Sequence, residues 1–413
     1  MKTFADDRSF QPEHAGQLDE AIARLLECPK TMTNGPCGGV GLDGGCEVKP
    51  SQPCVWVDTS RSEAVELLRT RNGVPDWSPS GEWSTAFTIR PTSTAAATAD
   101  RDARPIRSGS TLEGLLRAGR FVVTAEINPP DSADASLILS RVAPLADLVH
   151  AVHISDNSLA SPHMCGLALA SLIERAGIET ILHMTCRDRN RLMLQADMLG
   201  AAALGIKNIL CITGDHPSIG DHPQAKAVFD VDSVSMLAMF RHCRDTASLH
   251  SGRSLDAAPR IFLGGGGEPS APPFDHRPER LAKKVAAGAD FIVTQVVYDM
   301  DMFETWMARV RDLGLDEKVY ILVSVGALGG PEMARGMNAN TPGIVVPEAV
   351  IRRLERSPRG QRRDEGAQIC VEQIQRLLET PGVSGVDIMD TDPSRYIEII
   401  ETAGLTGEVM ATR

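Results

Sequence analysis

Short apolar runs alternate with longer amphipathic stretches through most of the chain after residue 120. The runs are rich in Val, Ile, Leu and Phe and are bounded by turn-forming residues, as buried strands are. We expect eight strands, at 121–126, 147–153, 179–184, 208–213, 260–264, 290–295, 319–324 and 385–389. Between them, apolar residues recur near i, i+3, i+4 and i+7, which predicts helices that include 189–205, 233–243, 278–287 and 364–379.

Strands that alternate with helices indicate the α/β class. Eight parallel strands close a (β/α)8 TIM barrel, whereas an open doubly wound sheet is the competing fold. The number and the regular spacing of the runs favour the barrel. Such barrels build their active sites at the C-terminal ends of the strands, so the residues that follow each run are the candidates for function.

A segment without hydrophobic periodicity divides the chain. Residues 91–112 are rich in Ala, Thr, Ser, Pro and charged side chains, which is typical of a linker. We therefore expect a cysteine-rich, metal-binding domain over 1–90, the linker over 91–112, and the barrel over 113–413.

Composition narrows the partners and the compartment. The chain has 413 residues and a formal net charge of −12 at pH 7. This acidic excess disfavours a general nucleic-acid surface, which needs clustered Lys and Arg. The sequence contains no apolar run of about 18 residues, and its first residues, MKTFADDRSF, have neither a basic start nor an apolar stretch. We expect a cytoplasmic protein that binds neither nucleic acid nor membrane.

Three residues at predicted strand ends are candidates for catalysis. Glu126 ends the run FVVTA, where partial burial would raise its pKa and make it a general acid; the alternative is a carboxylate bonded to the amides of the next turn. Asp215 follows Thr213 and Gly214, where an Asx-turn or a helix N-cap is the alternative. Gln295 presents an amide that suits the edge of a heterocycle, although it could equally bond a neighbouring strand.

Further polar groups and glycines are expected at the same mouth. The strand ends also carry Asp156, Asn157, Thr185, Cys186, Arg187, the glycines 264–267 and Asp387. The glycine run follows the fifth predicted strand, where it would let backbone amides approach a pyrophosphate or would form a flexible loop. The cations available to an anionic ligand are Arg187, Arg189, Arg277, Lys283 and Lys284, for which a solvated helix face is the alternative.

Four of the nine cysteines are grouped near the N-terminus. Cys28, Cys37, Cys46 and Cys54 are separated by gaps of similar length that are filled with Gly and Pro. Four thiolates in a segment with few apolar residues favour a structural zinc site, and an iron–sulfur cluster or four free thiols are the alternatives. The absence of CxxC pairs weakens the comparison with zinc ribbons. The other cysteines lie singly in apolar patterns, where a thiol behaves as a small hydrophobic group.

Several stretches together resemble one enzyme family. TAEINPP, HMTCRDRNR, LGAAALGIKNILCITGDHP, APPFDHRPERLAKKVAAGADFIVTQ and PGVSGVDIMD resemble methylenetetrahydrofolate reductases across residues 115–405. The N-terminal CPKTMTNGPCGGVGLDGGCEV is similar to a small cysteine-rich partner domain of this reductase. The family carries a Tyr-Pro-Glu-x-His-Pro segment after the fifth strand that helps to hold FAD, and this chain has GGGGEPSAPPFDHRP there.

The resemblance implies a flavin-mediated hydride transfer. NAD(P)H would reduce FAD, and the flavin would reduce 5,10-methylenetetrahydrofolate to 5-methyltetrahydrofolate, or the reaction would run in reverse. By resemblance, Glu126 protonates the folate, Asp215 lies near flavin and pterin, and Gln295 contacts the pterin. Cofactor contacts are assigned to Asp156, Asn157, His183, Thr185, Thr213, Gly214, Asp215, Gly265, Gly266, Arg277 and Lys284.

Two other functions remain open from the sequence. A folate-dependent methyltransferase or demethylase would use the same barrel without a bound flavin. A non-catalytic folate-binding subunit would recruit an electron-transfer protein through its N-terminal domain. In each case we expect reduced folate as the ligand and a homo-oligomer as the assembly.

Overall fold

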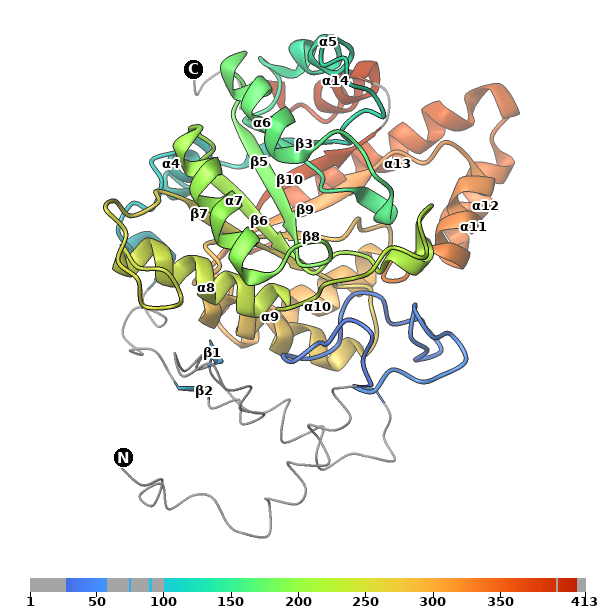
Figure 1. Cartoon of the computed structure of the whole chain (residues 1–413). Coiled ribbons are helices and arrows are strands. Elements are labelled where there is room, and N and C mark those ends of the chain that lie inside the picture. Colours follow the sequence, from blue (N-terminus) through green and yellow to red (C-terminus); the bar gives the residue numbers. More distant parts are fainter. Residues whose placement is uncertain (1–26, 58–73, 76–88, 91–99, 391–392, 407–413) are drawn as a thin grey trace.

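The computed structural model describes residues 27–57, 74–75, 89–90, 100–390 and 393–406 (Figure 1). The expected linker over 91–112 is therefore described only from residue 100 onwards. Of the expected N-terminal domain, the described residues include all four grouped cysteines.

Eight parallel strands form a closed barrel in the order β10-β3-β4-β5-β6-β7-β8-β9. Their bounds are Val122–Ile127 (β3), Ala151–Ile154 (β4), Thr180–Thr185 (β5), Asn208–Ile212 (β6), Phe262–Gly267 (β7), Phe291–Thr294 (β8), Tyr320–Gly326 (β9) and Val383–Met389 (β10). Every strand predicted from the apolar runs is present, with ends shifted by a few residues. The (β/α)8 barrel is confirmed, and the open doubly wound sheet is excluded.

Helices surround the barrel and connect its strands (Figure 1). They are Thr111–Arg117 (α4), Ser136–Val142 (α5), Gly166–Arg175 (α6), Arg191–Ala203 (α7), Ser233–Thr246 (α8), Arg277–Ala287 (α9), Met300–Asp312 (α10), Pro331–Asn340 (α11), Glu348–Arg356 (α12), Arg362–Leu378 (α13) and Pro393–Thr402 (α14). The four helices predicted from periodicity correspond to α7, α8, α9 and α13. In the described part of the chain, no helix is long and apolar enough to span a membrane.

Local sequence signals explain where the helices near the barrel mouth begin and end. The Asn190 side chain accepts hydrogen bonds from the amides of Leu192 and Met193 and so caps α7. Asp232 caps α8 in the same way through the amide of Ser235. Helix α9 ends at Ala287 and is capped by Gly288, whose φ of 113° suits a residue without a Cβ atom.

The barrel interior is apolar at one end and polar at the other. Its lower layer is a cluster that includes Val122, Ala151, Ile181, Leu210, Phe262, Phe291, Tyr320 and Leu322, closed from below by Leu112 and Leu116 of α4. Side chains alternate along a strand, so the next inward positions on β3, β4 and β5 are Thr124, His153 and His183. The apolar layer closes the N-terminal end of the barrel and leaves the polar layer facing the mouth.

The glycine run 264–267 is part of strand β7, so its interpretation as a flexible loop after the strand was wrong. Gly264 pairs with Leu210 of β6 and with Phe291 of β8. A Cβ atom on Gly264 would lie 2.4 Å from Cζ of Phe291, whose ring stacks on Phe262. Here glycine makes room for large aromatic side chains in the lower layer, and it does not supply a mobile loop.

The cysteine-containing segment 27–57 packs on the outside of the barrel beside α9 (Figure 1, dark blue). Buried Asp232 accepts hydrogen bonds from the backbone amide (3.1 Å) and the side-chain amide (3.0 and 3.1 Å) of Asn34. Arg280 donates to the carbonyls of Asn34 and Gly35. These bonds join the segment to the capping residue of α8 and to the middle of α9.

Candidate active site

The three candidate catalytic residues lie on one rim of the barrel. Glu126 is the second-last residue of β3, Asp215 follows β6, and Gln295 directly follows β8. Because all eight strands are parallel in a closed barrel, their C-terminal ends form a single mouth. The structure therefore brings these residues to the same end of the molecule despite their separation in sequence.

Glu126 has the environment of a carboxyl group that keeps its proton. Its side chain follows Val122 and Thr124 on the inward face of β3, and none of the described residues hydrogen-bonds to its carboxyl group. Tyr396 of α14 donates to its backbone carbonyl at 2.7 Å, which fixes the end of the strand. Burial, and then the neighbouring charge of Asp387, raise the pKa of Glu126 well above its usual range.

Asp387 completes an acidic pair with Glu126. It is fully buried on β10 and accepts hydrogen bonds from Ser324 (3.0 Å, to Oδ2) and Thr124 (3.1 Å, to Oδ1). Burial raises its pKa even though these two bonds oppose the shift. The sequence predicts Asp387 at a strand end but indicates no role for it. The feature of the sequence that could have indicated a role is the position of Asp387 on the inward face of the last strand, two residues after Gly385.

Two histidines extend this polar layer across the barrel. Nδ1 of His153 lies 3.0 Å from Nε2 of His183, and Nε2 of His153 lies 3.1 Å from Oγ1 of Thr124. Burial lowers the pKa of both histidines to about 3, so they are neutral. Hydrogen bonds thus run without a break from His183 through His153 and Thr124 to Asp387. His183 was predicted as a cofactor contact, whereas His153 was missed.

Asp156 and Thr185 hold the rim between β4 and β5. Asp156 accepts hydrogen bonds from the amide and the hydroxyl of Thr185 and from both terminal nitrogens of Arg189. Burial alone would raise the pKa of Asp156, but these bonds outweigh burial and hold the pKa below its usual value. Nearby, Oδ1 of Asn157 accepts from the amide of His163. The predicted cation Arg189 therefore binds a carboxylate of the protein, and so does Arg187 through Asp188.

The loop that carries Asp215 is narrow and lies against the cysteine segment. Gly214 has a φ of 87°, and a Cβ atom there would lie 2.9 Å from Cβ of Thr185. Its carbonyl accepts a hydrogen bond from Lys30 at 3.0 Å, and Thr213 donates to Ser233. The cysteine segment therefore reaches the residue next to Asp215.

The side-chain oxygen of Gln295 is hydrogen-bonded to the backbone of the protein. Through this oxygen, Gln295 accepts the amide of the next residue, Val296, at 3.0 Å, which is a local bond and not the bond to a neighbouring strand that we considered as the alternative. No described residue accepts a hydrogen bond from its side-chain nitrogen, which leaves that donor for a ligand at the mouth.

The cations predicted to meet an anionic cofactor near β7 bind groups of the protein. Lys284 is fully buried and bonds the carbonyl of Gly266 and the carboxylate of Glu268, while Gly265 lies against its side chain. Arg277 donates to the carbonyls of Ala271, Pro272, Pro36 and Cys37. Lys283 contacts the carbonyl of Asn34 at 3.5 Å. Glu268 also places a carboxylate where the resemblance expects a phosphate.

Three of the four grouped cysteines belong to one small cluster, and Cys46 lies near enough to act on Cys54 by charge. Cys28, Cys37 and Cys54 pack with Met32 and Trp56. Burial raises the pKa of Cys54 to about 12, and the charges of the other three cysteines add to the shift. Within the described residues, however, no three His, Cys, Asp or Glu side chains are arranged to hold a metal ion. The four thiols lie close enough for their charges to act on one another, and the zinc site expected from their spacing stays a prediction.

Comparison with known proteins agrees with this organisation. The family model described as methylenetetrahydrofolate reductase matches residues 111–404, and a model described as methylene-tetrahydrofolate reductase C terminal matches residues 18–82. A solved structure of an uncharacterized protein from Clostridium thermocellum, which binds two copies of 5-methyl-5,6,7,8-tetrahydrofolic acid, has the same fold. It superposes with a TM-score of 0.51 at 14% identity, over 74% of this chain and all of that one.

Curated relatives match parts of this chain at low identity. A probable methylenetetrahydrofolate reductase (NADPH) from Caenorhabditis elegans is 24% identical over 57% of this chain, and methylenetetrahydrofolate reductase 1 from Schizosaccharomyces pombe is 25% identical over 57%. The chain spans only 34% and 37% of those two relatives. A 5,10-methylenetetrahydrofolate reductase from Pectobacterium carotovorum is 25% identical over 49% of this chain and 63% of its own length. Because the family model covers the whole barrel, this chain belongs to the methylenetetrahydrofolate reductase family.

Proposed function

We propose that this chain reduces 5,10-methylenetetrahydrofolate to 5-methyltetrahydrofolate with hydride from NAD(P)H. The observation that carries the proposal is a partly buried carboxyl group with a raised pKa, Glu126, at the mouth of a barrel of this family. A group that keeps its proton near neutral pH is what a general acid requires. Relatives that are named as NADPH and NADH reductases support the choice of a nicotinamide as the reductant.

Glu126 supplies the proton that makes the folate reactive. It protonates one ring nitrogen at the methylene bridge, the bond from that nitrogen to the methylene carbon breaks, and an iminium cation forms on the other nitrogen. Hydride from the nicotinamide then adds to the methylene carbon and gives the methyl group and NAD(P)+. Water reprotonates Glu126, so one hydride and one proton are consumed in each turnover.

Asp215 and Gln295 bind and orient the substrate in this proposal. The carboxylate of Asp215 lies on the same rim and stabilises the developing iminium cation by charge. Gln295 donates its side-chain amide to the pterin edge, since that nitrogen has no partner among the described residues. His183 and the ordered pair of Asp156 and Thr185 form the adjoining wall of the mouth.

FAD was expected from the resemblance, but the described residues do not fit its diphosphate. Lys284 and Arg277 already bind protein oxygens, and the carboxylate of Glu268 lies beside Lys284. Residues of the cysteine segment cover this side of α9. A diphosphate placed there would meet a carboxylate without a free cation, which is unfavourable. In the proposed reaction the hydride therefore passes directly from the nicotinamide to the folate.

The absorbance spectrum of the purified protein tests whether FAD, which the resemblance implies, is bound. We expect no stoichiometric flavin band after purification or after incubation with FAD. A tightly bound flavin in a one-to-one ratio would show that Glu268 and the cysteine segment rearrange to admit it.

The cysteine cluster is proposed to bind zinc through Cys28, Cys37, Cys46 and Cys54. The donor set supports this, because four neighbouring thiols are the ligands that structural zinc prefers. Elemental analysis of native protein should find about one zinc per chain, and Cys46→Ser should lower that content. Iron would indicate a cluster, and neither metal would leave four free thiols.

The remaining proposals concern partners and assembly. We propose a reduced folate as the ligand of the barrel mouth, a cytoplasmic location and a homo-oligomeric assembly. An electron-transfer protein is the alternative reductant if neither nicotinamide supports turnover. Light scattering on the purified chain and assays with each nicotinamide distinguish these outcomes.

Steady-state turnover tests the proposed reaction. Anaerobic incubation with 5,10-methylenetetrahydrofolate and NADH or NADPH should yield 5-methyltetrahydrofolate in equal amount to the nicotinamide oxidised. Binding of the folate without turnover would favour a binding subunit. Transfer of a methyl group to a second acceptor would favour a methyltransferase.

A further inference from the structure

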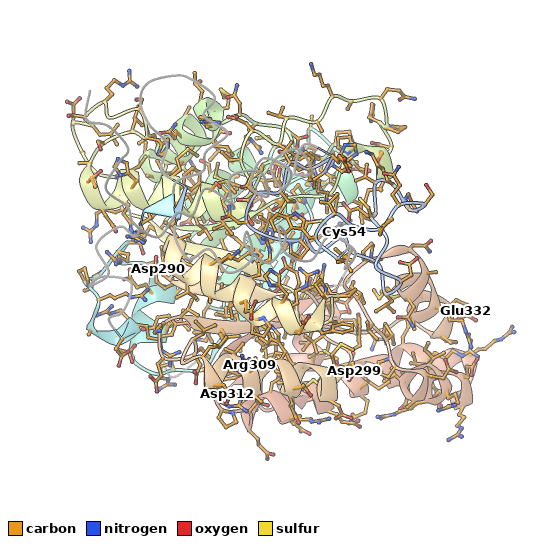
Figure 2. The ribbon with its side chains drawn as sticks, turned by 90° about the horizontal axis from the view of Figure 1, so that it is seen from below. Cys54, Asp290, Asp299, Arg309, Asp312 and Glu332 are labelled. Atoms are coloured by element: carbon orange, nitrogen blue, oxygen red, sulfur yellow. The ribbon has the colours of Figure 1, made fainter. Side chains whose placement is uncertain are left out.

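Residues 30–34 of the cysteine segment contact the loop that carries Asp215. This loop, residues 213–232, joins β6 to α8 at the mouth of the barrel. Asp290 directly precedes β8 and so marks the opposite end of the barrel, and Figure 2 shows Cys54 of the cysteine segment well away from it. The contacts between the segment and the loop therefore lie at the end where the reaction is proposed to take place.

Three contacts hold both ends of this loop. At its start, Nζ of Lys30 donates a hydrogen bond to the carbonyl of Gly214 at 3.0 Å. Near its end, Oγ1 of Thr31 donates to the carbonyl of Phe229 at 2.5 Å. The bonds from Asn34 to the capping residue of α8 hold its last residue. One short stretch of the cysteine segment thus fixes both ends of the loop.

Lys30 is buried where it makes this contact. It is 4% exposed, and its ammonium group forms an ion pair with Glu47, whose side chain is 5% exposed. Asp215 lies near enough for its charge to act on this ammonium group. Burial, and then the charge of Lys30, lower the pKa of His216. Lys30 thus acts on residues 214–216 while its own side chain stays covered by the protein.

The cysteine segment has two features that keep Lys30 in this position. A Cβ atom on Gly39 would lie 1.7 Å from Oε2 of Glu47, so only glycine leaves room for the carboxylate that pairs with Lys30. Thr31 has a φ of 45°, a left-handed conformation that a β-branched residue rarely adopts. Such backbone strain persists where the surrounding contacts hold it, and it is concentrated at functional sites. Both features favour a functional contact over an incidental one.

We propose that Lys30 is a positioning residue for the folate reaction. By holding the carbonyl of Gly214, it keeps the carboxylate of Asp215 in place at the mouth. This role rests on the proposed function, in which Asp215 stabilises the iminium cation by charge. Because Lys30 is buried, it acts through Asp215 and does not touch the substrate. The cysteine segment is thereby part of the active site.

Steady-state kinetics of Lys30→Met test this role. The substitution removes the donor to Gly214 and should lower kcat and kcat/KM about tenfold each. KM for the folate should stay unchanged, because Asp215 acts on charge that develops in the transition state. The matched control is Lys49→Met, an exposed lysine of the same segment whose Nζ lies 3.4 Å from the carbonyl of Glu27. That control should turn over as the unmodified chain does.

A double-mutant cycle shows whether Lys30 acts through Asp215. In the Asp215→Asn background, Lys30→Met should change kcat by less than about twofold, since the group through which it acts is already lost. A purely structural role for Lys30 would lower kcat equally in both backgrounds. That result would overturn the proposal.

A further variant removes the cost of an unpaired buried charge. Lys30→Met leaves the carboxylate of Glu47 buried without its cation, which is destabilising in itself. Lys30→Met combined with Glu47→Gln removes both charges but still lacks the donor to Gly214. This double variant should show the same loss of kcat, and a normal kcat would overturn the proposal.

Hydrogen exchange separates failure of this role from failure of the proposed function. The amides of residues 213–216 should exchange faster in Lys30→Met than in Lys49→Met, whether or not the chain reduces the folate. If the unmodified chain does not reduce the folate but this difference is found, the proposed function fails and the hold on the loop stands. If the chain reduces the folate and the exchange rates are equal, the positioning role alone is overturned.

Discussion

Asp387→Asn should move the pH dependence of folate reduction without abolishing it. Asp387 lies opposite Thr124, and Glu126 is the next inward residue on β3. Two residues along a strand span about 6.6 Å. Two charges at that distance with an effective dielectric constant of about 20 interact by roughly 2 to 3 kcal/mol. This corresponds to between one and two pKa units, so Glu126 should lose its proton at a lower pH in the variant.

The assay is the pH profile of turnover at saturating folate. In the unmodified chain the rate should fall as pH rises through the raised pKa of Glu126. In Asp387→Asn this fall should begin about one to two units lower, while the rate on the acidic side stays close to normal. His153 and His183, which face the same layer, are neutral, and Tyr396 does not ionise in this range.

Two comparisons show what would refute this reasoning. Asp390→Asn removes a carboxylate three residues further along the chain. It is the control because, among the described residues, the charge that raises the pKa of Glu126 is that of Asp387. That control should leave the profile in place. A uniform loss of rate at every pH in Asp387→Asn, or an equal shift in the control, would mean that Asp387 has only a structural role.

Unfolding measurements provide a check that does not depend on activity. The folded pKa values of Glu126 and Asp387 are raised, so their protonated forms stabilise the fold fully below the unfolded carboxyl pKa of about 4. That stability is lost as pH rises through the folded values. The unmodified chain should therefore lose more free energy of unfolding between pH 4 and pH 8 than Asp387→Asn. Identical slopes would contradict the coupling.

Three further variants probe catalysis, the barrel and the N-terminal segment. Glu126→Gln should lower kcat for folate reduction by about 10² to 10⁴ with little change in KM, because the amide keeps the shape without the proton; an unchanged kcat would remove the assignment. Gly264→Ala should destabilise the fold by about 1 to 3 kcal/mol in urea unfolding, whereas Gly266→Ala, whose Cβ meets nothing closer than 3.6 Å, should cost less. Asn34→Ala should speed proteolysis of the cysteine segment through loss of bonds worth about 1 to 3 kcal/mol, and exposed Lys49→Ala is its control.

The barrel could be predicted because its signal is local. Each apolar run forms one strand, and eight such strands are the number that closes a parallel barrel. The errors lie at the ends of strands: the run at 147–153 becomes a strand only from Ala151, because residues 143–145 form a 3-10 helix and the chain turns before the strand. Such boundaries depend on tertiary packing, which periodicity does not report.

The glycine run was misread because glycine propensity describes the backbone alone. Position 264 has to be glycine because the ring of Phe291, which is distant in sequence, fills the space that a Cβ atom would need. Only the register of β7 against β8 reveals that requirement.

The acidic pair and the histidine chain were only partly predictable. Glu126 follows from its place at a strand end, and the position of Asp215 and Gln295 on the same rim follows from parallel strands. The bonds that link Asp387 to Thr124 and His153 depend on which strands become neighbours when the barrel closes. The contact of Asn34 with Asp232, 198 residues away, likewise has no signal in either local sequence.

Isotope transfer from the nicotinamide to the folate tests the central claim most directly. The chain should be incubated anaerobically with 5,10-methylenetetrahydrofolate and NADH or NADPH that carries deuterium at the transferred position, and the product analysed by mass spectrometry. The account predicts 5-methyltetrahydrofolate with one deuterium in its methyl group for each nicotinamide oxidised. Absence of 5-methyltetrahydrofolate with both nicotinamides, or a methyl group without deuterium, would contradict it.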